Sequence, residues 1–394
     1  MHPFGPEATR DPHPVYAQLR EEAPVHEIAL KADSTVWFVT RHEDVRKALS
    51  DPRLSKDLGP MRLGGAMAFP PEIHNAVSSH MLSMDPPDHT RLRRLVSSVF
   101  TARRVADLRP AVQRISDELL AGLDGADEAD LLDAYAFPLP LQVICELLGV
   151  PMADRESFRE WSNTIVAGAY APPEEAGKAI MAMVGYVREL IGAKRQTADD
   201  ALMSALVAAT DGGDRLTEDE LTSMVFLLLI AGHETTVNLI GNGMHLLLDH
   251  PEQADRLRAD PSLLPAAIEE FLRIESPVKT ATVRLAKEPV DFSGVVVPAG
   301  AIVMVSLLSA NHDPRAFADP ERFDPARTDN QHLAFGHGLH YCLGAPLARL
   351  EAQIAIHDLL TRFPKMRPAR PLNELNWKSG VLLRALDELP VVLR

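Results

Sequence analysis

Cys342 lies in a glycine-rich segment, Phe-Gly-His-Gly-Leu-His-Tyr-Cys-Leu-Gly, whose residue types could bind a metal cofactor. Gly336 and Gly338 permit backbone conformations closed to other residues, so the segment could approach a flat cofactor closely. A helical pattern with Pro346 in its first turn follows, and the positive end of such a helix lowers the pKa of a nearby thiol. The thiolate is the form that binds a soft metal. A lone cysteine is also commonly a buried structural residue, so both interpretations stay open.

An acidic residue and a hydroxyl, Glu234 and Thr235, stand in the middle of a strongly apolar helical pattern. Burying them without partners would cost about 1–3 kcal/mol or more, so their presence needs a reason. One possible reason is structural, because a threonine can hydrogen-bond to the preceding turn and bend its helix. His233 and Glu234 together are reminiscent of a zinc-protease helix, but that motif requires a histidine where this chain has Val237. The pattern therefore argues against zinc at this place.

Two further pairs of side chains have helical spacing. Glu270 and Arg273 are three residues apart and would share a helix face as an ion pair, although most such pairs are solvated surface features. His89 and Arg93 are four residues apart beside an apolar stripe. Cationic side chains next to a core stripe suit the binding of carboxylate groups, whereas a charge run by itself is usually a solvated face.

Together these segments resemble the cytochrome P-450 family, the haem-thiolate monooxygenases. The resemblance rests on Phe-Gly-x-Gly-x-His-x-Cys-x-Gly at residues 335–344, on Ala-Gly-x-Glu-Thr at residues 231–235, where the family more commonly has Asp than Glu, and on Glu-x-x-Arg at residues 270–273. It covers almost the whole chain and is closest to soluble bacterial enzymes that hydroxylate polyketides, macrolides and steroid-like molecules. It implies haem b as the cofactor and Cys342 as the axial ligand of the haem iron.

The resemblance also implies roles for individual residues. Glu234 would relay protons and Thr235 would hydrogen-bond dioxygen, and these two would be the catalytic residues. Ala231 and Gly232 would leave room for dioxygen over the haem. A buried structural triad beneath the haem would consist of Glu270, Arg273 and Arg322. Seven residues would contact the haem, the first four of them through its propionates: His89, Arg93, Arg284, His340, Phe335, Gly336 and Gly344.

By the same resemblance, the reaction inserts one oxygen atom from O2 into a C–H bond of a medium-to-large apolar substrate. The substrate would be of the macrolide, polyketide, steroid or terpene type, as in secondary metabolism. The pocket would draw on residues 59–84 and 167–177. Six further positions could also line it, although apolar residues at such places often serve packing alone: Leu229, Val278, Thr282, Val283, Val381 and Leu382.

The resemblance also implies a small iron–sulfur ferredoxin with a ferredoxin reductase as the electron donor, and the length of the chain leaves no room for a fused flavin reductase. Five arginines could form a basic patch that steers an acidic partner, or could simply be scattered over the surface: Arg91, Arg94, Arg103, Arg104 and Arg349.

Three alternatives remain at this stage. One is a haem-thiolate enzyme driven by peroxide, which would have less need of Glu234 and Thr235. Another is a catalytically silent haem-thiolate protein that recruits a second protein. The third, a zinc hydrolase using His337, His340 and Cys342, lacks a further ligand for a convincing tetrahedral site.

The elements that must position these residues are mostly helices, so we expect a mainly α protein with a small β portion. A short strand is expected at residues 35–40, a helix at 42–49, an irregular loop at 59–71 and helices throughout 88–275. A capping box at residues 217–220 opens a helix that Pro251 ends, about 48 Å long at about 1.5 Å per residue. β segments are expected at residues 290–297 and 301–307.

The resemblance implies the cytochrome P-450 fold with this long central helix over the haem. Residues 1–394 would form a single haem-binding domain. Its β-containing part would lie at about 1–85, its helical bulk at about 86–275, and its β segments with the Cys342 loop at about 276–394.

Composition restricts the partners and the compartment. The formal net charge of −15 argues against nucleic acid as a partner. With two cysteines the chain has no disulfide framework, which favours a reducing compartment. The start of the chain lacks a signal-peptide pattern, and the apolar run at residues 224–231 is far shorter than the roughly 20 residues of a membrane span. We therefore expect a cytoplasmic protein without membrane contact. A monomer is expected as well.

Overall fold

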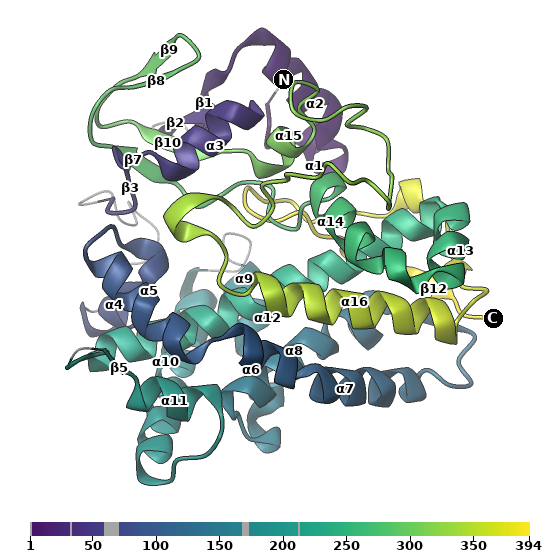
Figure 1. Ribbon diagram of the computed structural model, residues 1–394, viewed down its shortest axis with the longest axis horizontal. Coiled ribbons are helices and arrows are strands. Elements are labelled where there is room, and N and C mark those ends of the chain that lie inside the picture. The colour runs from purple at the N-terminus through teal and green to yellow at the C-terminus, as the bar shows by residue number, and fades with distance from the viewer. Residues whose placement is uncertain (1, 32–33, 59–70, 168–172, 212) are drawn as a thin grey trace. The chain divides into compact units, whose positions relative to one another are not determined.

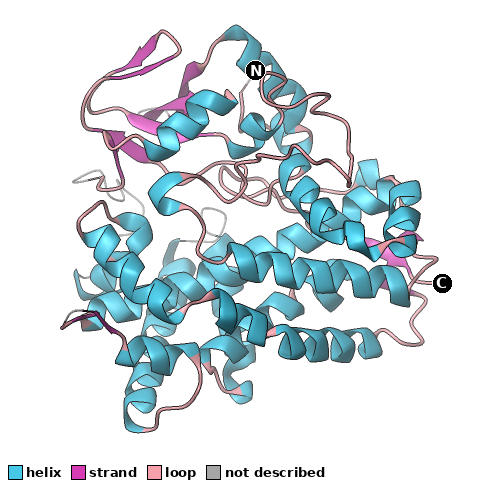
Figure 2. Cartoon of the chain, in the orientation of Figure 1, coloured by secondary structure: helices cyan, strands magenta, loops and turns pink. Residues whose placement is uncertain are grey.

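The computed structural model describes residues 2–31, 34–58, 71–167, 173–211 and 213–394. The chain forms two compact units. The first consists of Met1–Ser55, Ser116–Phe137 and Thr235–Arg394, and the second of Lys56–Ile115 and Pro138–Glu234. Figure 2 shows that most of the described chain is helical, with a few short strands. The prediction of a mainly α fold with a small β portion is therefore confirmed.

The first unit contains helices near its amino terminus and in its carboxyl-terminal half (Figure 1). Its helices and helical turns are α1 (Pro6–Arg10), α2 (Pro12–Glu22), α3 (His42–Ser50), η3 (Leu132–Ala136), α13 (Pro251–Ala259), η6 (Pro261–Leu263), α14 (Leu264–Ile274), α15 (Leu307–Asn311), η7 (Gly338–His340), α16 (Ala345–Arg362) and η8 (Leu372–Glu374).

The second unit is built almost entirely from helices. These are α4 (Pro71–Ser78), η2 (Met81–Ser83), α5 (Asp88–Val99), α6 (Ala102–Asp107), α8 (Pro138–Leu148), η4 (Met152–Asp154), α9 (Arg155–Ala167), α10 (Pro173–Gln196) and α11 (Leu202–Ala208), with the small hairpin of β5 (Thr210–Asp211) and β6 (Asp214–Arg215). Two helices, α7 (Arg109–Gly122) and α12 (Glu218–Asp249), run from one unit into the other. The loop expected at residues 59–71 lies outside the described residues except for Pro71, which begins α4.

A five-stranded sheet organises the first unit. Its strands are β1 (Val25–Lys31), β2 (Ser34–Val39), β10 (Ile302–Val305), β7 (Arg284–Ala286) and β3 (Leu54–Ser55), in that spatial order. β2 is the strand predicted from residues 35–40, and β10 pairs with it in parallel, with Val303 opposite Trp37.

Successive residues of β2 point to opposite faces of the sheet, and both faces are covered. Val39 belongs to a core cluster with Val45 of α3, whereas Phe38 belongs to a cluster with Tyr16 of α2. The sheet is therefore covered on both sides at β2, which explains why β2 and its neighbour β10 read as nearly continuous apolar runs.

The remaining strands of the first unit form two small sheets. β8 (Val290–Phe292) and β9 (Val295–Val297) make a hairpin within residues 290–297, where the sequence predicted β structure but not the turn at Ser293 and Gly294. The turn between them places Ser293 and Gly294 at φ values of 49° and 93°, which is the geometry of a tight hairpin. β11 (Arg367–Pro368), β12 (Pro390–Val392) and β4 (Glu128–Asp130) form a three-stranded sheet.

The helix α12 begins with the predicted capping box. The amide of Glu220 donates to Oγ1 of Thr217 at 3.3 Å, and the amide of Thr217 donates to Oε2 of Glu220 at 2.8 Å. The helix ends at Asp249, immediately before His250 and Pro251. Among the described helices, α12 is long and apolar enough to span a membrane by composition, but 61% of its most apolar window is buried, as expected of a core helix.

Close packing within the first unit depends on a glycine of α12. A Cβ atom at Gly243 would lie 2.9 Å from Cδ2 of Phe271, a fully buried residue of α14. Since real Cβ contacts are not this short, only glycine lets α12 and α14 approach so closely here.

Candidate active site

The Cys342 loop is held in a fixed conformation by its own backbone. The amide of Cys342 donates to the carbonyl of Phe335 at 2.9 Å, which closes the loop. Gly336 and Gly338 have φ values of 75° and 73°, in the region that favours glycine. A Cβ at Gly338 would also lie 3.2 Å from the carbonyl oxygen of Leu49, so this glycine lets the loop lie against the end of α3.

Cys342 is exposed, whereas the other cysteine, Cys145, is buried in α8. The helix α16 begins at Ala345, three residues after Cys342, with Pro346 in its first turn. Burial raises the pKa of the Cys145 thiol to about 12, so that side chain stays protonated. The exposed thiol at a helix start therefore suits a metal ligand, and the buried thiol does not.

Arg349 of α16 anchors the Cys342 loop. Its guanidinium lies over the ring of Phe335, 4.5 Å from the ring centroid, and donates to both carboxylate oxygens of Glu269 at 2.7 Å. His332 also donates to Glu269, at 3.0 Å. Burial alone would raise the pKa of Glu269, but the hydrogen bonds from Arg349 and His332 outweigh it and hold that pKa at about 2. Arg349, predicted as part of a basic patch, thus has an anchoring role that no local sequence pattern indicates.

Other arginines of the expected basic patch also have acidic or carbonyl partners. Arg91 pairs with Glu220 and, at 3.4 Å, with Asp214. Nε of Arg103 lies 3.9 Å from Asp107. Arg104 donates to the carbonyl of Asp200 at 3.3 Å. Of these contacts, the ion pairs of Arg91 neutralise part of the positive charge on which the patch was predicted.

The predicted propionate contacts of the first unit are Arg284 and His340. Arg284 is buried in β7 and donates to the carbonyl of Thr282 at 3.2 Å. His340 is partly exposed in η7, two residues before Cys342. Gly344 lies just before α16, and a Cβ there would be 3.9 Å from Sγ of Cys342, an ordinary contact distance.

The predicted haem contacts of the second unit lie on α5. His89 is almost fully buried, at 2% exposure, and Arg93 is partly buried one turn later on the same face. Burial lowers the pKa of His89, and the positive charge of Arg93 lowers it further. An anion bound beside these two side chains would reverse the effect of Arg93, so the pair is electrostatically suited to a carboxylate.

The predicted catalytic pair lies in α12, where the two units meet in the sequence. Glu234 is the last residue of the second unit and is buried at 6% exposure, and Thr235 is partly exposed. Ala231, one turn earlier, is exposed. A Cβ at Gly232 would lie 3.1 Å from Cδ1 of Ile144, so this glycine also serves the packing of α12 against α8.

His233 lies between these residues and joins two helices of the second unit. Its Nδ1 donates to the carbonyl of Leu229 at 2.8 Å, and its Nε2 accepts from the hydroxyl of Ser162 in α9 at 2.9 Å. Burial lowers the pKa of His233 to about 4, so the ring is neutral. No local sequence pattern indicates this role of His233, because Ser162 lies 71 residues away in the chain.

Glu270 and Arg273 form a fully buried ion pair. Nε and Nη2 of Arg273 each donate to one oxygen of Glu270 at 2.8 Å, and both side chains are 0% exposed. The third residue of this network differs from the prediction. Arg327, 10% exposed, donates to Oε1 of Glu270 at 3.2 Å.

The prediction for the Arg322 side chain is therefore corrected. It is 64% exposed and pairs with Asp324, and only its carbonyl accepts from Arg273, at 3.3 Å. Both arginines lie in the same loop, and the loop conformation turns the side chain of Arg327 toward Glu270. Arg322 was predicted as the third residue of the triad because it follows Pro320 and Glu321, as in the family motif.

The structure brings together two of the segments expected near the substrate. Val278 pairs with Leu383 in an isolated bridge, and the hydroxyl of Thr280 donates to the carbonyl of Val381 at 2.7 Å. Val283 and Val381 pack against the apolar cluster that contains Phe38. Packing therefore accounts for part of the expected lining.

The other expected lining residues differ in exposure. Thr282 and Leu382 are exposed, and Leu229 of α12 is buried. Residues 59–70 and 168–172, which belong to the two expected lining loops, lie outside the described residues.

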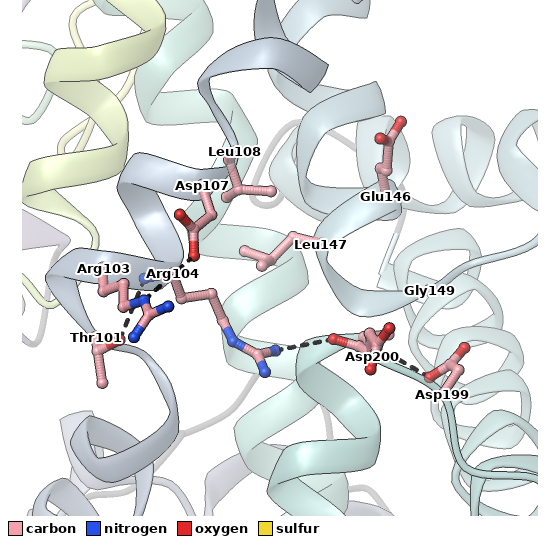
Figure 3. A pocket seen from close by; sticks show the side chains of 11 residues that line it. Thr101, Arg103, Arg104, Asp107, Leu108, Glu146, Leu147, Gly149, Asp199 and Asp200 are labelled. Carbon is pink, nitrogen blue, oxygen red and sulfur yellow. Dashed lines mark hydrogen bonds and ion pairs between the residues drawn. The ribbon is translucent and has the colours of Figure 1, made fainter.

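A pocket of about 770 Å³ opens on the second unit between α6, the end of α8 and the segment after α10 (Figure 3). Arg103, Arg104, Asp107, Glu146 and Asp200 give it a strongly charged lining. None of the residues predicted to contact haem or substrate lines this pocket. Its charge also makes it unsuitable for an apolar substrate.

Comparison with known proteins identifies the family. Residues 173–387 match the family model for Cytochrome P450. Cytochrome P450 107B1 of Saccharopolyspora erythraea is 51% identical over 391 residues, covering 97% of this chain and 95% of that protein. Vitamin D(3) 25-hydroxylase of Pseudonocardia autotrophica is 48% identical over 385 residues, covering 98% and 94%. The solved structure of the tirandamycin C-bound P450 monooxygenase TamI has a TM-score of 0.92 at 47% identity and covers the whole of both chains.

The chain therefore belongs to the cytochrome P450 family. It is a P450 monooxygenase with the cytochrome P450 fold, and its cofactor is haem b, which proteins of this family bind through a cysteine thiolate. The resemblance found in the sequence is confirmed by the family model and by relatives that cover nearly the whole chain.

Proposed function

We propose that Cys342 supplies the thiolate that binds the haem iron, and that the whole chain acts as one haem-binding domain. The observation that carries this proposal is the contrast between the two cysteines. Cys342 is exposed in a closed, glycine-dependent loop at the start of α16, and Cys145 is buried. With a cysteine thiolate as its ligand, haem iron activates dioxygen for insertion of one oxygen atom into a C–H bond.

The residues proposed to hold the haem fall into two groups. Phe335, Gly336 and Gly344 shape the loop around Cys342, and Ala231 and Gly232 are small residues of α12 that leave space. Four cationic or histidine side chains would bind the two propionates by charge-assisted hydrogen bonds: His89, Arg93, Arg284 and His340.

Within α12, we assign Glu234 the delivery of protons and Thr235 the hydrogen bond to dioxygen. A buried carboxylate next to a partly exposed hydroxyl can pass protons toward a dry reaction site, because each group can both accept and donate when protonated. A peroxide-driven enzyme or a silent haem protein would have less use for this costly arrangement.

The proposed substrate is a medium-to-large apolar molecule of the macrolide, polyketide, steroid or terpene type. This rests on the relative named vitamin D(3) 25-hydroxylase and on the structure with tirandamycin C bound. The pocket would include Leu229, Val278, Thr282, Val283, Val381 and Leu382. Electrons would come from a small ferredoxin and its reductase, in the cytoplasm, with the enzyme as a monomer.

The test compares Cys342→Ser with Cys145→Ser in the haem-loaded protein. Carbon monoxide added to the reduced wild type should give the far-shifted Soret band of a thiolate-bound haem. Cys145→Ser should keep this band, and Cys342→Ser should lose it. A band that survives in Cys342→Ser would refute the assignment of the ligand.

A further inference from the structure

Three potential metal ligands meet in the first unit, outside the Cys342 loop. They are His13 of α2, His312, which follows α15, and Glu321 in the next loop. One ligand-type atom of each residue lies within 4.8 Å of those of the other two. The two imidazole rings lie 4.2 Å apart between centroids. Two ligands of a tetrahedral zinc ion lie roughly 3.4 Å apart, so the cluster has nearly the size of a metal site.

The hydrogen bonds of His312 leave one of its ring nitrogens, an acceptor, facing a carboxylate oxygen of Glu321. Its Nε2 lies 2.9 Å from the carbonyl oxygen of Ile274 and must donate to it, because a carbonyl can only accept. In the neutral ring, Nδ1 then carries a lone pair, yet it lies 3.0 Å from Oε2 of Glu321, another acceptor. Two acceptors at this distance repel each other unless a cation, either a proton or a metal ion, lies between them.

Burial disfavours the proton as that cation. His312 is 1% exposed, so placing a positive charge on its ring would cost desolvation free energy. A metal ion avoids this cost, since it binds the neutral imidazole through the same lone pair. The contact between Nε2 of His312 and the carbonyl of Ile274 would then orient the ring, as a backbone carbonyl commonly does for metal-bound histidines.

His13 is oriented in a similar way by a buried carboxylate. Its Nε2 lies 3.3 Å from Oε1 of Glu275, and Oε2 of Glu275 accepts from Nε of Arg384 at 3.0 Å. Arg384 also donates to the carbonyl of Thr9 at 2.7 Å. A carboxylate fixed in this manner holds the imidazole in one orientation and strengthens it as a ligand.

We propose that His13, His312 and Glu321 bind a divalent transition metal ion of the zinc type. Two imidazole nitrogens and one carboxylate oxygen suit Zn²⁺, and poorly suit Ca²⁺ or Mg²⁺, which prefer oxygen ligands. The side chain of Glu321 is 59% exposed, so solvent reaches the site and a water completes the coordination. The ion links α2 to the loop after α15, two segments about 300 residues apart, and its role is structural.

The test measures zinc binding to the haem-loaded protein prepared without a histidine tag. The protein is treated with EDTA, dialysed against zinc chloride, and analysed for zinc against its own haem iron. We expect about one tightly bound zinc per chain, and a loss of affinity of about tenfold or more in His13→Ala and in Glu321→Gln. Both side chains are partly or largely exposed, so these variants should fold.

His357→Ala is the matched control, because His357 lies on α16 and is not one of the three ligands. This variant should bind zinc as the wild type does, and zinc should raise the melting temperature of both. A wild type that binds no zinc would overturn the proposal, and so would equal zinc binding in His13→Ala and Glu321→Gln. Equal loss in His357→Ala would show non-specific binding and would also refute the site.

Discussion

The hydroxyl of Thr235 is the smallest feature on which the proposed chemistry depends. If it hydrogen-bonds dioxygen, Thr235→Ala should divert reducing equivalents into hydrogen peroxide, because dioxygen then loses the hydroxyl that donates a hydrogen bond to it. Peroxide formed per NADPH consumed should rise several-fold, with a smaller loss in NADPH consumption. The measurement is peroxide and hydroxylated product per NADPH with a surrogate ferredoxin and reductase.

Thr236→Ala provides the matched control. Thr236 is the next residue of α12 and is buried at 3% exposure, so it tests the effect of losing any hydroxyl at this point of the helix. In this variant, the hydroxylated product formed per NADPH consumed should stay close to that of the wild type. Equal peroxide yields from both variants would remove Thr235 from its assigned role.

The side chain of Arg327, and not that of Arg322, should stabilise the folded protein through the Glu270 network. Arg327 donates to Glu270 and to the carbonyls of Ala318, Asp319 and Arg322, at 2.9 to 3.2 Å. Arg327→Ala removes the arginine donor of the Ala318 and Asp319 carbonyls and one of several donors to the fully buried Glu270, and should cost about 3 kcal/mol in the free energy of unfolding.

Arg322→Ala removes only an exposed side chain and should change that free energy by less than about 1 kcal/mol. Urea unfolding of the haem-loaded protein measures both variants. A larger loss in Arg322→Ala than in Arg327→Ala would contradict the structure.

Helix packing decides the next prediction, which concerns glycines in two long helices. Gly243→Ala in α12 would bring a methyl group to 2.9 Å from the ring of the buried Phe271. The ring cannot move away easily, so the substitution should destabilise the protein by about 1–2 kcal/mol despite the better helix propensity of alanine.

Gly192→Ala in α10 is the matched comparison, since a Cβ there meets no atom within 4 Å. This variant should be stabilised by about 0.5–1 kcal/mol, because alanine lowers the entropy lost on forming the helix. Thermal unfolding followed by circular dichroism measures both changes. Equal effects of the two substitutions would show that packing of α12 on α14 is not the cause.

The stability of the folded chain should fall in mild acid because it contains histidines that are buried in the neutral form. The clearest is His233, whose pKa is lowered from 6.5 to about 4. Between these values the unfolded chain binds a proton that the folded chain does not, so stability decreases as pH falls below 6.5. His233 alone should contribute a loss of about 2 kcal/mol between pH 7 and pH 5.

His233→Gln removes the titrating group and can keep a hydrogen bond to Ser162. Its free energy of unfolding should therefore change less between pH 7 and pH 5 than that of the wild type. Urea unfolding at the two pH values measures the difference. If both proteins lose the same amount, His233 does not titrate as its burial predicts.

Much of the architecture could be predicted because its causes are local. The capping box joins Thr217 and Glu220, which are only three residues apart, so the start of α12 can be predicted from the sequence. The strand β2 and the β structure at residues 290–297 likewise follow from nearby residues. The Cys342 loop was found because its glycines and cysteine lie within ten residues and form a distinctive motif.

The partners of charged and polar side chains could not be predicted, because they depend on segments distant in the chain. The sequence alone determined the family, the long helix α12 and the glycine-rich loop that contains Cys342. Only the tertiary structure decided that Arg327 binds Glu270, that Arg349 anchors the Cys342 loop through Glu269, and that His13 lies against His312. A charge is satisfied by whichever opposite group the folded backbone brings near it, and no local pattern encodes that choice.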